Sequence, residues 1–273
     1  SHTQLSRSVP RQHLEQIVCG DTVLIQSQDN VDAVVAAIQA RDSLLQKPGF
    51  GGKLKPMAAN IDQVVIVMAV QPVPNTYLID RYLVATENLH ANGLILLNKM
   101  DLAGSKSILT SLHEEYEKLG YQVVPTSISD DESMHSLNQR LNNKTSILVG
   151  LSGVGKSALI KTLLPDQNIR VGEVSAASGE GTHTTTGSIL YHLPAGGDII
   201  DSPGVRDFGL WNTTADDVLY GFVELRNHAG HCKFSDCRHD IEPDCAIKDA
   251  YASGEISEQR YKHYKKIIQE YSS

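Results

Sequence analysis

The sequence lacks an apolar run long enough to span a membrane. A spanning helix needs roughly 20 apolar residues, whereas the longest strongly apolar run here, Val64 to Val70, has the length of one buried strand. The N-terminus also lacks the charged-then-apolar pattern of a secretion signal. We therefore expect a cytoplasmic protein that does not enter a membrane.

The chain also lacks an excess of positive charge. Its formal net charge is −8, which argues against a general nucleic-acid binder. The acidity is local, because residues 61–225 carry ten Lys/Arg against nineteen Asp/Glu. Residues 1–60 carry six against five, and residues 226–273 carry eight against eight. Contact with RNA through local patches on these two flanks remains compatible with the sequence.

Cysteine is scarce, with four residues, and three of them gather near the C-terminus. In a chain without a secretion signal, such a cluster favours a metal over disulfides. The spacing Cys232-x4-Cys237-x-His239-x5-Cys245 offers three thiolates and one imidazole, a set typical of tetrahedral, structural Zn²⁺. A catalytic zinc is not expected, since this set leaves no ligand position for water.

The most informative stretch present is a glycine-rich loop between a predicted strand, 146–149, and a predicted helix, 158–164. It has the form G-x-x-x-x-G-K-S, and its strand–loop–helix context is typical of a phosphate-binding loop. Lys156 would reach the β- and γ-phosphates and Ser157 would hold Mg²⁺. The residues expected to contact nucleotide are Gly150, Leu151, Ser152, Gly153, Val154, Gly155, Lys156, Ser157 and Ala158.

A guanine-reading motif, N-K-x-D, follows another predicted strand, 94–97. It consists of Asn98, Lys99, Met100 and Asp101. Asp101 would accept from the guanine N1–H and 2-amino groups; adenine offers neither donor, so an unpaired carboxylate would reject ATP. The next strand ends at Thr126 and Ser127, where a short guanine contact and a plain turn are both possible.

A third motif, D-x-x-G, runs from Asp201 to Gly204 after the predicted strand 198–200. Asp201 would hold Mg²⁺ through water, and the Gly204 N–H would meet the γ-phosphate. Either Thr184 or Thr185, in a polar segment upstream, would complete the Mg²⁺ coordination with Ser157; we select Thr185.

The catalytic step needs a group that orients the attacking water. Ras-type GTPases use a glutamine after D-x-x-G, but Val205 occupies that position here and can neither donate nor accept. His183, beside the threonines, is the best candidate because an imidazole can accept a hydrogen bond near neutral pH. The alternative is a surface histidine in a loop.

The order of these motifs differs from that of ordinary GTPases, in which N-K-x-D comes last. Here it precedes the phosphate loop, which predicts a circularly permuted GTPase. Strands that alternate with helices from residue 61 predict a mostly parallel α/β sheet. We place domain boundaries near residues 60 and 225. Residues 1–60 predict a small β-barrel, residues 61–225 the GTPase, and residues 226–273 the zinc-binding part, which closes with a helix over 257–270. A single helix is predicted over 216–225.

With these motifs the sequence resembles the ribosome small-subunit-dependent GTPase A family (RsgA, also called YjeQ). The resemblance includes residues 59–63, 183–186 and 201–206. It implies an N-terminal OB-fold that binds RNA, a central permuted GTPase and a small, helical zinc domain. It further implies GTP hydrolysis stimulated by the small (30S) ribosomal subunit and its 16S rRNA, late in the maturation of that subunit, by a monomer that also binds GDP.

Two other functions remain open at this point. One is a nucleotide-gated rRNA-binding module in which hydrolysis is incidental. The other is a phosphate-loop kinase or ATPase, against which the guanine motif from Asn98 to Asp101 argues.

Overall fold

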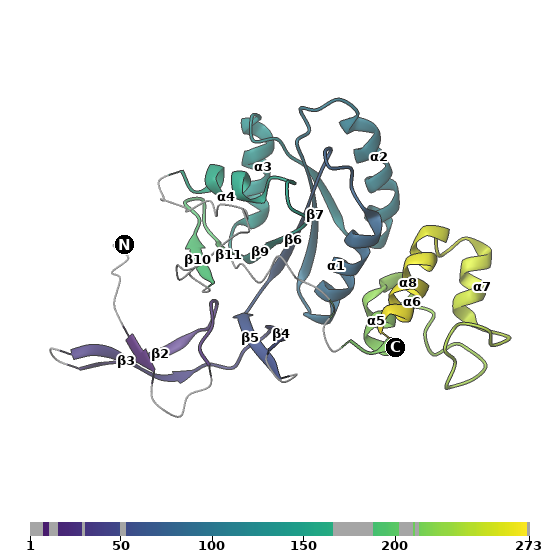
Figure 1. Ribbon diagram of the computed structural model, residues 1–273, viewed down its shortest axis with the longest axis horizontal. Helices are drawn as coiled ribbons and strands as arrows, with labels where there is room; N and C mark the ends of the chain where they lie inside the picture. Colours follow the sequence, from purple (N-terminus) through teal and green to yellow (C-terminus); the bar gives the residue numbers. More distant parts are fainter. Residues whose placement is uncertain are drawn as a thin grey trace, which may run out of the picture.

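The computed structural model describes residues 8–10, 16–28, 31–49, 53–165, 188–201, 210 and 213–271. Within these ranges the chain has three parts (Figure 1). Small sheets come first, a central sheet flanked by helices follows, and a group of helices closes the chain.

The central sheet has six strands in the order β10-β11-β9-β6-β7-β8. All neighbouring pairs are parallel except β10 and β11, which form an antiparallel pair. The carboxyl ends of the parallel strands therefore share one edge of the sheet, where ligands bind in folds of this kind. The strands are β6 (Gln63–Ala69), β7 (Asn92–Asn98), β8 (Gln122–Pro125), β9 (Thr145–Val149), β10 (Ile189–His192) and β11 (Asp198–Asp201).

Strand β6 explains why residues 64–70 form a continuous apolar run in the sequence. Alternate side chains of a strand point to opposite faces. Val64 and Ile66 belong to one hydrophobic core, while Val65 and Val67 belong to a second. Both faces of the sheet are thus covered, as parallel sheets require.

The helices that cover the sheet are α1 (Thr76–Asn88), α2 (Ser105–Tyr116), η2 (Glu117–Leu119), α3 (Asp131–Leu141) and α4 (Lys156–Leu163). Side chains of α1 and α2 pack in the first core, and those of α3 and α4 pack in the second. The Asn75 side chain accepts from the Leu78 N–H at the start of α1, and Asp130 does the same for Glu132 at the start of α3.

The N-terminal part contains two small sheets. Strands β1 (Ser8–Pro10), β3 (Val31–Ile38) and β2 (Val23–Gln28) form one, in that order, and β4 (Leu44–Pro48) pairs with β5 (Leu54–Ala59) in the other. This β-structure agrees with the predicted barrel-like fold. The apolar residues of 31–40 are spaced in a way that suits either a helix or a strand, and the structure forms β3 there. Strand β5 was not predicted from the sequence.

The N-terminal part meets the central sheet through a few short contacts. Gly20 has a φ of +89°, and a Cβ there would lie 2.0 Å from the Ala59 carbonyl oxygen of β5, in the same part, and 3.4 Å from Ile200 Cδ1 of β11. The Cys19 thiol donates to the Ser188 carbonyl over 2.9 Å. The Ser188 hydroxyl donates to the Met57 carbonyl over 3.4 Å. Each of these residue pairs shares one hydrogen bond, and none of the partners carries a charge.

The last helices of the chain are α5 (Ala215–Gly221) and α6 (Val223–Arg226), before the predicted boundary near residue 225, and α7 (Ala246–Ser253) and α8 (Glu258–Tyr271) after it. The single helix predicted over 216–225 is wrong, because Phe222 is extended and divides it. Phe222 is fully buried, and its ring meets Tyr264 edge-on, so core packing overrides the helical pattern. Within the described ranges, no helix combines the length and apolarity needed to cross a membrane.

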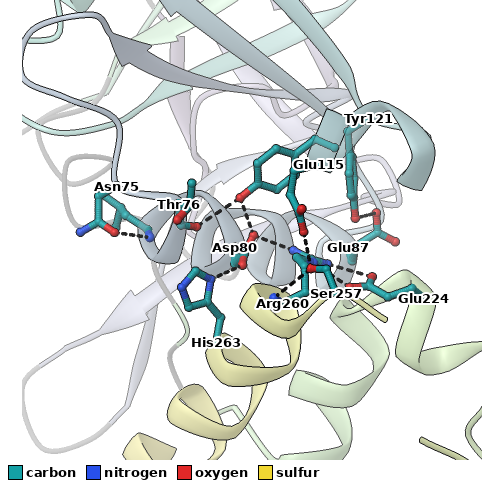
Figure 2. A network of polar contacts seen from close by, with 12 residues as sticks. Asn75, Thr76, Asp80, Glu87, Glu115, Tyr121, Glu224, Ser257, Arg260 and His263 are labelled. Carbon is teal, nitrogen blue, oxygen red and sulfur yellow. Dashed lines mark hydrogen bonds and ion pairs between the residues drawn. The ribbon is translucent and has the colours of Figure 1, made fainter. Parts of the chain in front are cut away.

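A buried charge cluster attaches α8 to the central part (Figure 2). Arg260 donates to Asp80 of α1 over 2.6 Å and to both carboxylate oxygens of Glu224, on α6, over 2.7 and 2.9 Å. Asp80 also accepts from Tyr116 over 2.8 Å and lies 2.5 Å from His263 Nδ1. Burial alone lowers the pKa of Arg260, but the charges of Asp80 and Glu224 outweigh it and raise the pKa. The guanidinium therefore stays charged in the interior.

Candidate functional site

The glycine-rich loop leaves β9 and turns into α4 at the carboxyl edge of the sheet. Gly150, Gly153 and Gly155 all have positive φ. A Cβ at Gly150 would lie 2.2 Å from the Val67 carbonyl oxygen, so this position admits glycine alone. Helix α4 starts at Lys156, as a phosphate-binding loop requires, and its N-terminus favours an anion.

The Lys156 ammonium lies against the loop itself. Its Nζ donates to the carbonyls of Gly150 and Leu151 over 2.6 and 2.8 Å. Ser157, the expected Mg²⁺ ligand, occupies the first turn of α4, and Ala158 follows it. The loop therefore holds a cation and a helix N-terminus together, which suits a polyphosphate.

The guanine motif is joined directly to the phosphate loop. Asn98 ends β7, and its Nδ2 donates to the Val154 carbonyl over 2.9 Å. A Cβ at Gly155 would lie 2.3 Å from the same Nδ2, so the two motifs are in close contact. Lys99 Nζ donates to the Gly153 carbonyl over 2.7 Å, which fixes its stem across the loop. The structure thus brings together two motifs separated by about fifty residues of sequence.

Two hydroxyl residues at the end of β8 complete this region. The Ser127 hydroxyl donates to Asp101 Oδ1 over 2.6 Å, and this hydrogen bond lowers the pKa of the Asp101 carboxyl. Thr126 and Ser127 are both buried, and the Thr126 carbonyl accepts from the Met100 N–H over 3.2 Å. Asp101 is exposed and held ionised, ready to accept from a base. From the sequence alone, a short guanine contact and a plain turn were both possible at Thr126 and Ser127.

Two buried polar atoms in this region have no partner in the described part of the chain. They are Asn98 Oδ1 and Thr126 Oγ1. A buried polar atom that makes no hydrogen bond costs free energy, so two together favour a ligand with polar edges. Guanine has such edges, so an acceptor at Asn98 Oδ1 and a hydroxyl at Thr126 fit the predicted base.

Asp201, the expected Mg²⁺-linked aspartate, ends β11 and is exposed. Strand β11 pairs with β9 in parallel, with Ile200 opposite Ile147, so Asp201 lies at the edge where the phosphate loop begins. The other predicted residues of this region, His183, Thr184, Thr185 and Gly204, lie outside the described residues.

The three cysteines and the histidine of the C-terminal motif form one compact cluster. The ligand atoms of Cys232, Cys237, His239 and Cys245 all lie within 4.8 Å of one another. His239 Nδ1 is 3.5 Å from the sulfurs of both Cys232 and Cys245, and these two sulfurs are 3.9 Å apart. Tetrahedral Zn²⁺ with Zn–S bonds of about 2.3 Å and a Zn–N bond of about 2.0 Å places its ligands about 3.5–3.8 Å apart. The cluster therefore fits zinc.

The surroundings of the cluster suit a structural metal. Cys245 and His239 are buried, and burial lowers the pKa of the His239 imidazole, which favours the neutral form that binds metal. Cys245 is also the residue that precedes α7, so the cluster fixes the start of that helix. No water position remains in a four-ligand set, which agrees with a site that supports the fold.

Comparison with known sequences gives one consistent family. The family model described as RsgA GTPase matches residues 38–211. The chain is 46% identical over 266 residues to a Hahella chejuensis protein named "Small ribosomal subunit biogenesis GTPase RsgA", covering 97% of this chain and 76% of that protein. It is 48% identical over 259 residues to the Chromohalobacter salexigens protein of the same name, covering 94% and 76%.

Comparison with solved structures agrees. The fold is similar to that of YjeQ from Thermotoga maritima, with a TM-score of 0.79 and 32% identity over 96% of this chain and 88% of that one. It is also similar to YloQ, described as a circularly permuted GTPase, with a TM-score of 0.76 and 29% identity over 95% and 82%. The permuted order of motifs is therefore a feature of the whole fold.

Proposed function

Because the chain belongs to the RsgA GTPase family, we propose that it hydrolyses GTP in the biogenesis of the small ribosomal subunit and that this subunit stimulates the hydrolysis. The observation that best supports the proposal is the contact between Asn98 and the phosphate loop, which brings the predicted base-reading and phosphate-binding motifs into one site. Its relatives carry the ribosomal function in their names.

The proposal assigns a role to each part of the chain. Residues 1–60 form an OB-fold-like domain that contacts 16S rRNA, residues 61–225 bind and hydrolyse GTP, and residues 226–273 form a domain held by one zinc ion. The protein acts as a monomer in the cytoplasm. The cysteine and histidine distances support the zinc assignment.

Within the nucleotide site, the residues divide the work. Asp101, held ionised by Ser127, pairs with the guanine edge. Lys156 and the N–H groups of the loop bind the phosphates. Ser157 and Thr185 would hold Mg²⁺ directly and Asp201 would hold it through water, and the ion would neutralise charge on the phosphates. Gly204 meets the γ-phosphate. His183 orients the attacking water, because Val205 cannot.

The experiment that tests the function is GTP turnover with and without purified small ribosomal subunits. We expect slow hydrolysis by the protein alone and strong stimulation by the subunits. Equal rates would contradict the proposal and favour the nucleotide-gated binding module. A matched measurement with ATP should show no stimulation, since adenine cannot satisfy Asp101.

Two variants test the residue assignments. Asp101→Asn should weaken GTP binding by roughly 1.5–3 kcal/mol for each charged hydrogen bond lost, and it should admit xanthosine triphosphate. His183→Ala should keep GTP affinity but lose the stimulation, measured as single-turnover hydrolysis on saturating subunits. Parental rates in His183→Ala would show that another group positions the water.

A further inference from the structure

Ser188, directly before β10, is held by two separate stretches of the N-terminal part. Its carbonyl accepts from the Cys19 thiol over 2.9 Å, and its hydroxyl donates to the Met57 carbonyl over 3.4 Å. Cys19 belongs to the turn before β2, and Met57 belongs to β5. One residue of the central part is therefore fixed to the N-terminal part through both its main chain and its side chain.

The two stretches that hold Ser188 are themselves bonded into one body. The Ala59 N–H, at the end of β5, donates to the Cys19 carbonyl over 2.9 Å. Asp21, two residues after Cys19, pairs with Arg41 over 2.7 Å. The turn and β5 should therefore move together, and Ser188 should move with them.

The Cys19 sulfur also bonds to the outer side of β10. This strand lies at the end of the six-stranded sheet, with β11 on its inner side (Figure 1). An outer strand presents N–H and C=O groups that have no neighbouring strand. Here the thiol donates to the Ser188 carbonyl, and the Leu190 backbone forms a hydrogen bond with the sulfur. Burial raises the pKa of Cys19 above its ordinary value of 9.0, although the Leu190 bond lowers it, so the thiol keeps the proton that it donates.

Ser188 lies beside the predicted magnesium position. The next residue, Ile189, is the cross-strand partner of Asp201, and such partners have Cα atoms about 4.5–5.5 Å apart. In the other direction, Thr185 is three residues and His183 five residues away, both outside the described residues. Because extended chain spans at most about 3.6 Å per residue, Ser188 confines Thr185 to within about 11 Å and His183 to within about 18 Å.

We propose that Ser188 is a positioning residue, through which the N-terminal part sets the place of the chain that carries Thr185 and His183. The inference rests on the proposed function and names a contact through which the small subunit stimulates hydrolysis. When the subunit fixes the N-terminal part, Cys19 and Met57 fix Ser188 and so restrict the chain before it. Such restriction matters to the rate, since a misplacement of about 1 Å at a reacting group can cost roughly 100-fold.

The test measures single-turnover GTP hydrolysis by the full chain over a range of small-subunit concentrations. It separates the rate at saturating subunits from the subunit concentration that gives half of that rate. Cys19→Ala and Ser188→Ala should each lower the saturated rate by about two- to tenfold, the effect of one net hydrogen bond on a barrier. The half-saturating concentration, the GTP affinity and the rate without subunits should remain those of the parent, because the motifs that bind GTP are untouched.

Two further variants distinguish positioning from general loosening. The Ser43 hydroxyl accepts from the Ile61 N–H over 2.7 Å, where the N-terminal part leads into β6. Ser43→Ala therefore removes a hydroxyl from the same joint without touching Ser188, and it should keep the parental saturated rate. Cys19→Ser keeps a donor to the Ser188 carbonyl and should recover most of the rate that Cys19→Ala loses, which a role in apolar packing alone would not allow.

Parental saturated rates in Cys19→Ala and Ser188→Ala would overturn the positioning role and leave the proposed function intact. So would a change confined to the half-saturating concentration, since the contact would then serve docking only. An equal loss of saturated rate in Ser43→Ala would also overturn it. A parent chain that the subunits do not stimulate would instead overturn the proposed function, and this inference with it.

Discussion

The two ends of the chain are attached to the same central sheet by different kinds of contact. At the C-terminal end, Arg260 is buried between Asp80 and Glu224. At the N-terminal end, Cys19, Met57 and Ser188 share single hydrogen bonds between neutral groups. A buried charge tolerates no loss of its partner, whereas single neutral hydrogen bonds each contribute about 1 kcal/mol. Loss of one residue should therefore disrupt the whole C-terminal attachment, whereas each residue lost from the N-terminal attachment should weaken it by a small amount.

The largest effect is expected from the metal cluster. Structural zinc supplies roughly 10–16 kcal/mol of apparent binding free energy that small domains spend on folding. Metal analysis of the parent should give one zinc per chain. Cys237→Ala should lose the metal and the fold of the C-terminal part while GTP binding is kept. Cys19→Ala, remote from the cluster, should keep the zinc. A metal-free protein with its C-terminal part fully folded would contradict this.

The next effect concerns the buried charge cluster. Arg260→Met removes the guanidinium that pairs with Glu224 and Asp80, although Asp80 keeps Tyr116 and His263, and breaking a buried pair in this way costs about 3–5 kcal/mol. Urea unfolding should show that loss in the free energy of unfolding. Lys262→Met, on the same helix but exposed, should change it by less than about 1 kcal/mol.

The combined variant Asp80→Asn/Glu224→Gln/Arg260→Met sharpens this result. It removes the uncompensated charges, so it should recover more than half of the stability lost in Arg260→Met. If it is less stable than the single variant, the Asp80 and Glu224 carboxylates still stabilise the fold without Arg260, through partners such as Tyr116 and His263.

Within the N-terminal part, Gly20→Ala should cost about 1–3 kcal/mol. Its positive φ strains any side chain, and the added Cβ would meet the Ala59 carbonyl oxygen at 2.0 Å. Gly120→Ala is the matched control, because Gly120 has a φ of +92° with nothing within 4 Å of the added Cβ. Hydrogen exchange of residues 16–59 should increase in the first variant only. Equal effects would mean that backbone strain alone acts.

The smallest effect is expected from the Arg41–Asp21 ion pair. Burial alone raises the pKa of Asp21, but hydrogen bonds from Arg41 and the Val18 N–H, together with the Arg41 charge, bring it below its ordinary value of 3.8. Its contribution is then complete above that pH and is lost as the pH falls through the lowered pKa. Arg41→Gln should cost at most about 1.5 kcal/mol at neutral pH, and the difference from the parent should shrink near pH 3. A difference that grows in acid would contradict this sign.

The sequence was sufficient where chemistry constrains neighbouring residues. The phosphate loop, the guanine motif and the cysteine–histidine cluster each occupy a short stretch, and the structure assembles the described members of each. The Ser127–Asp101 contact was not predictable, because it joins residues 26 apart and depends on β7 pairing with β8.

Contacts that depend on the tertiary fold left no pattern in the sequence. Asp80 and Arg260 are 180 residues apart, and neither position differs locally from an ordinary surface charge. The break at Phe222 follows from the burial of one ring, which outweighs the helical preference of its neighbours. Alternating strands and helices revealed the central sheet, but how the two flanks attach to it came from the structure.

The permuted sheet order also decides what a translating ribosome releases first. Strands β6, β7 and β8 are complete by Pro125, so the half that reads the base can assemble before the phosphate loop is made. Until β9 emerges and pairs with it, β6 is an uncovered edge strand, a position open to unwanted pairing. Synthesis adds roughly 5–20 residues each second, so this edge stays open for seconds. The nascent chain can thus form the part that carries the predicted guanine motif early. The nucleotide site is completed later, when the phosphate loop is made and Val154 contacts Asn98.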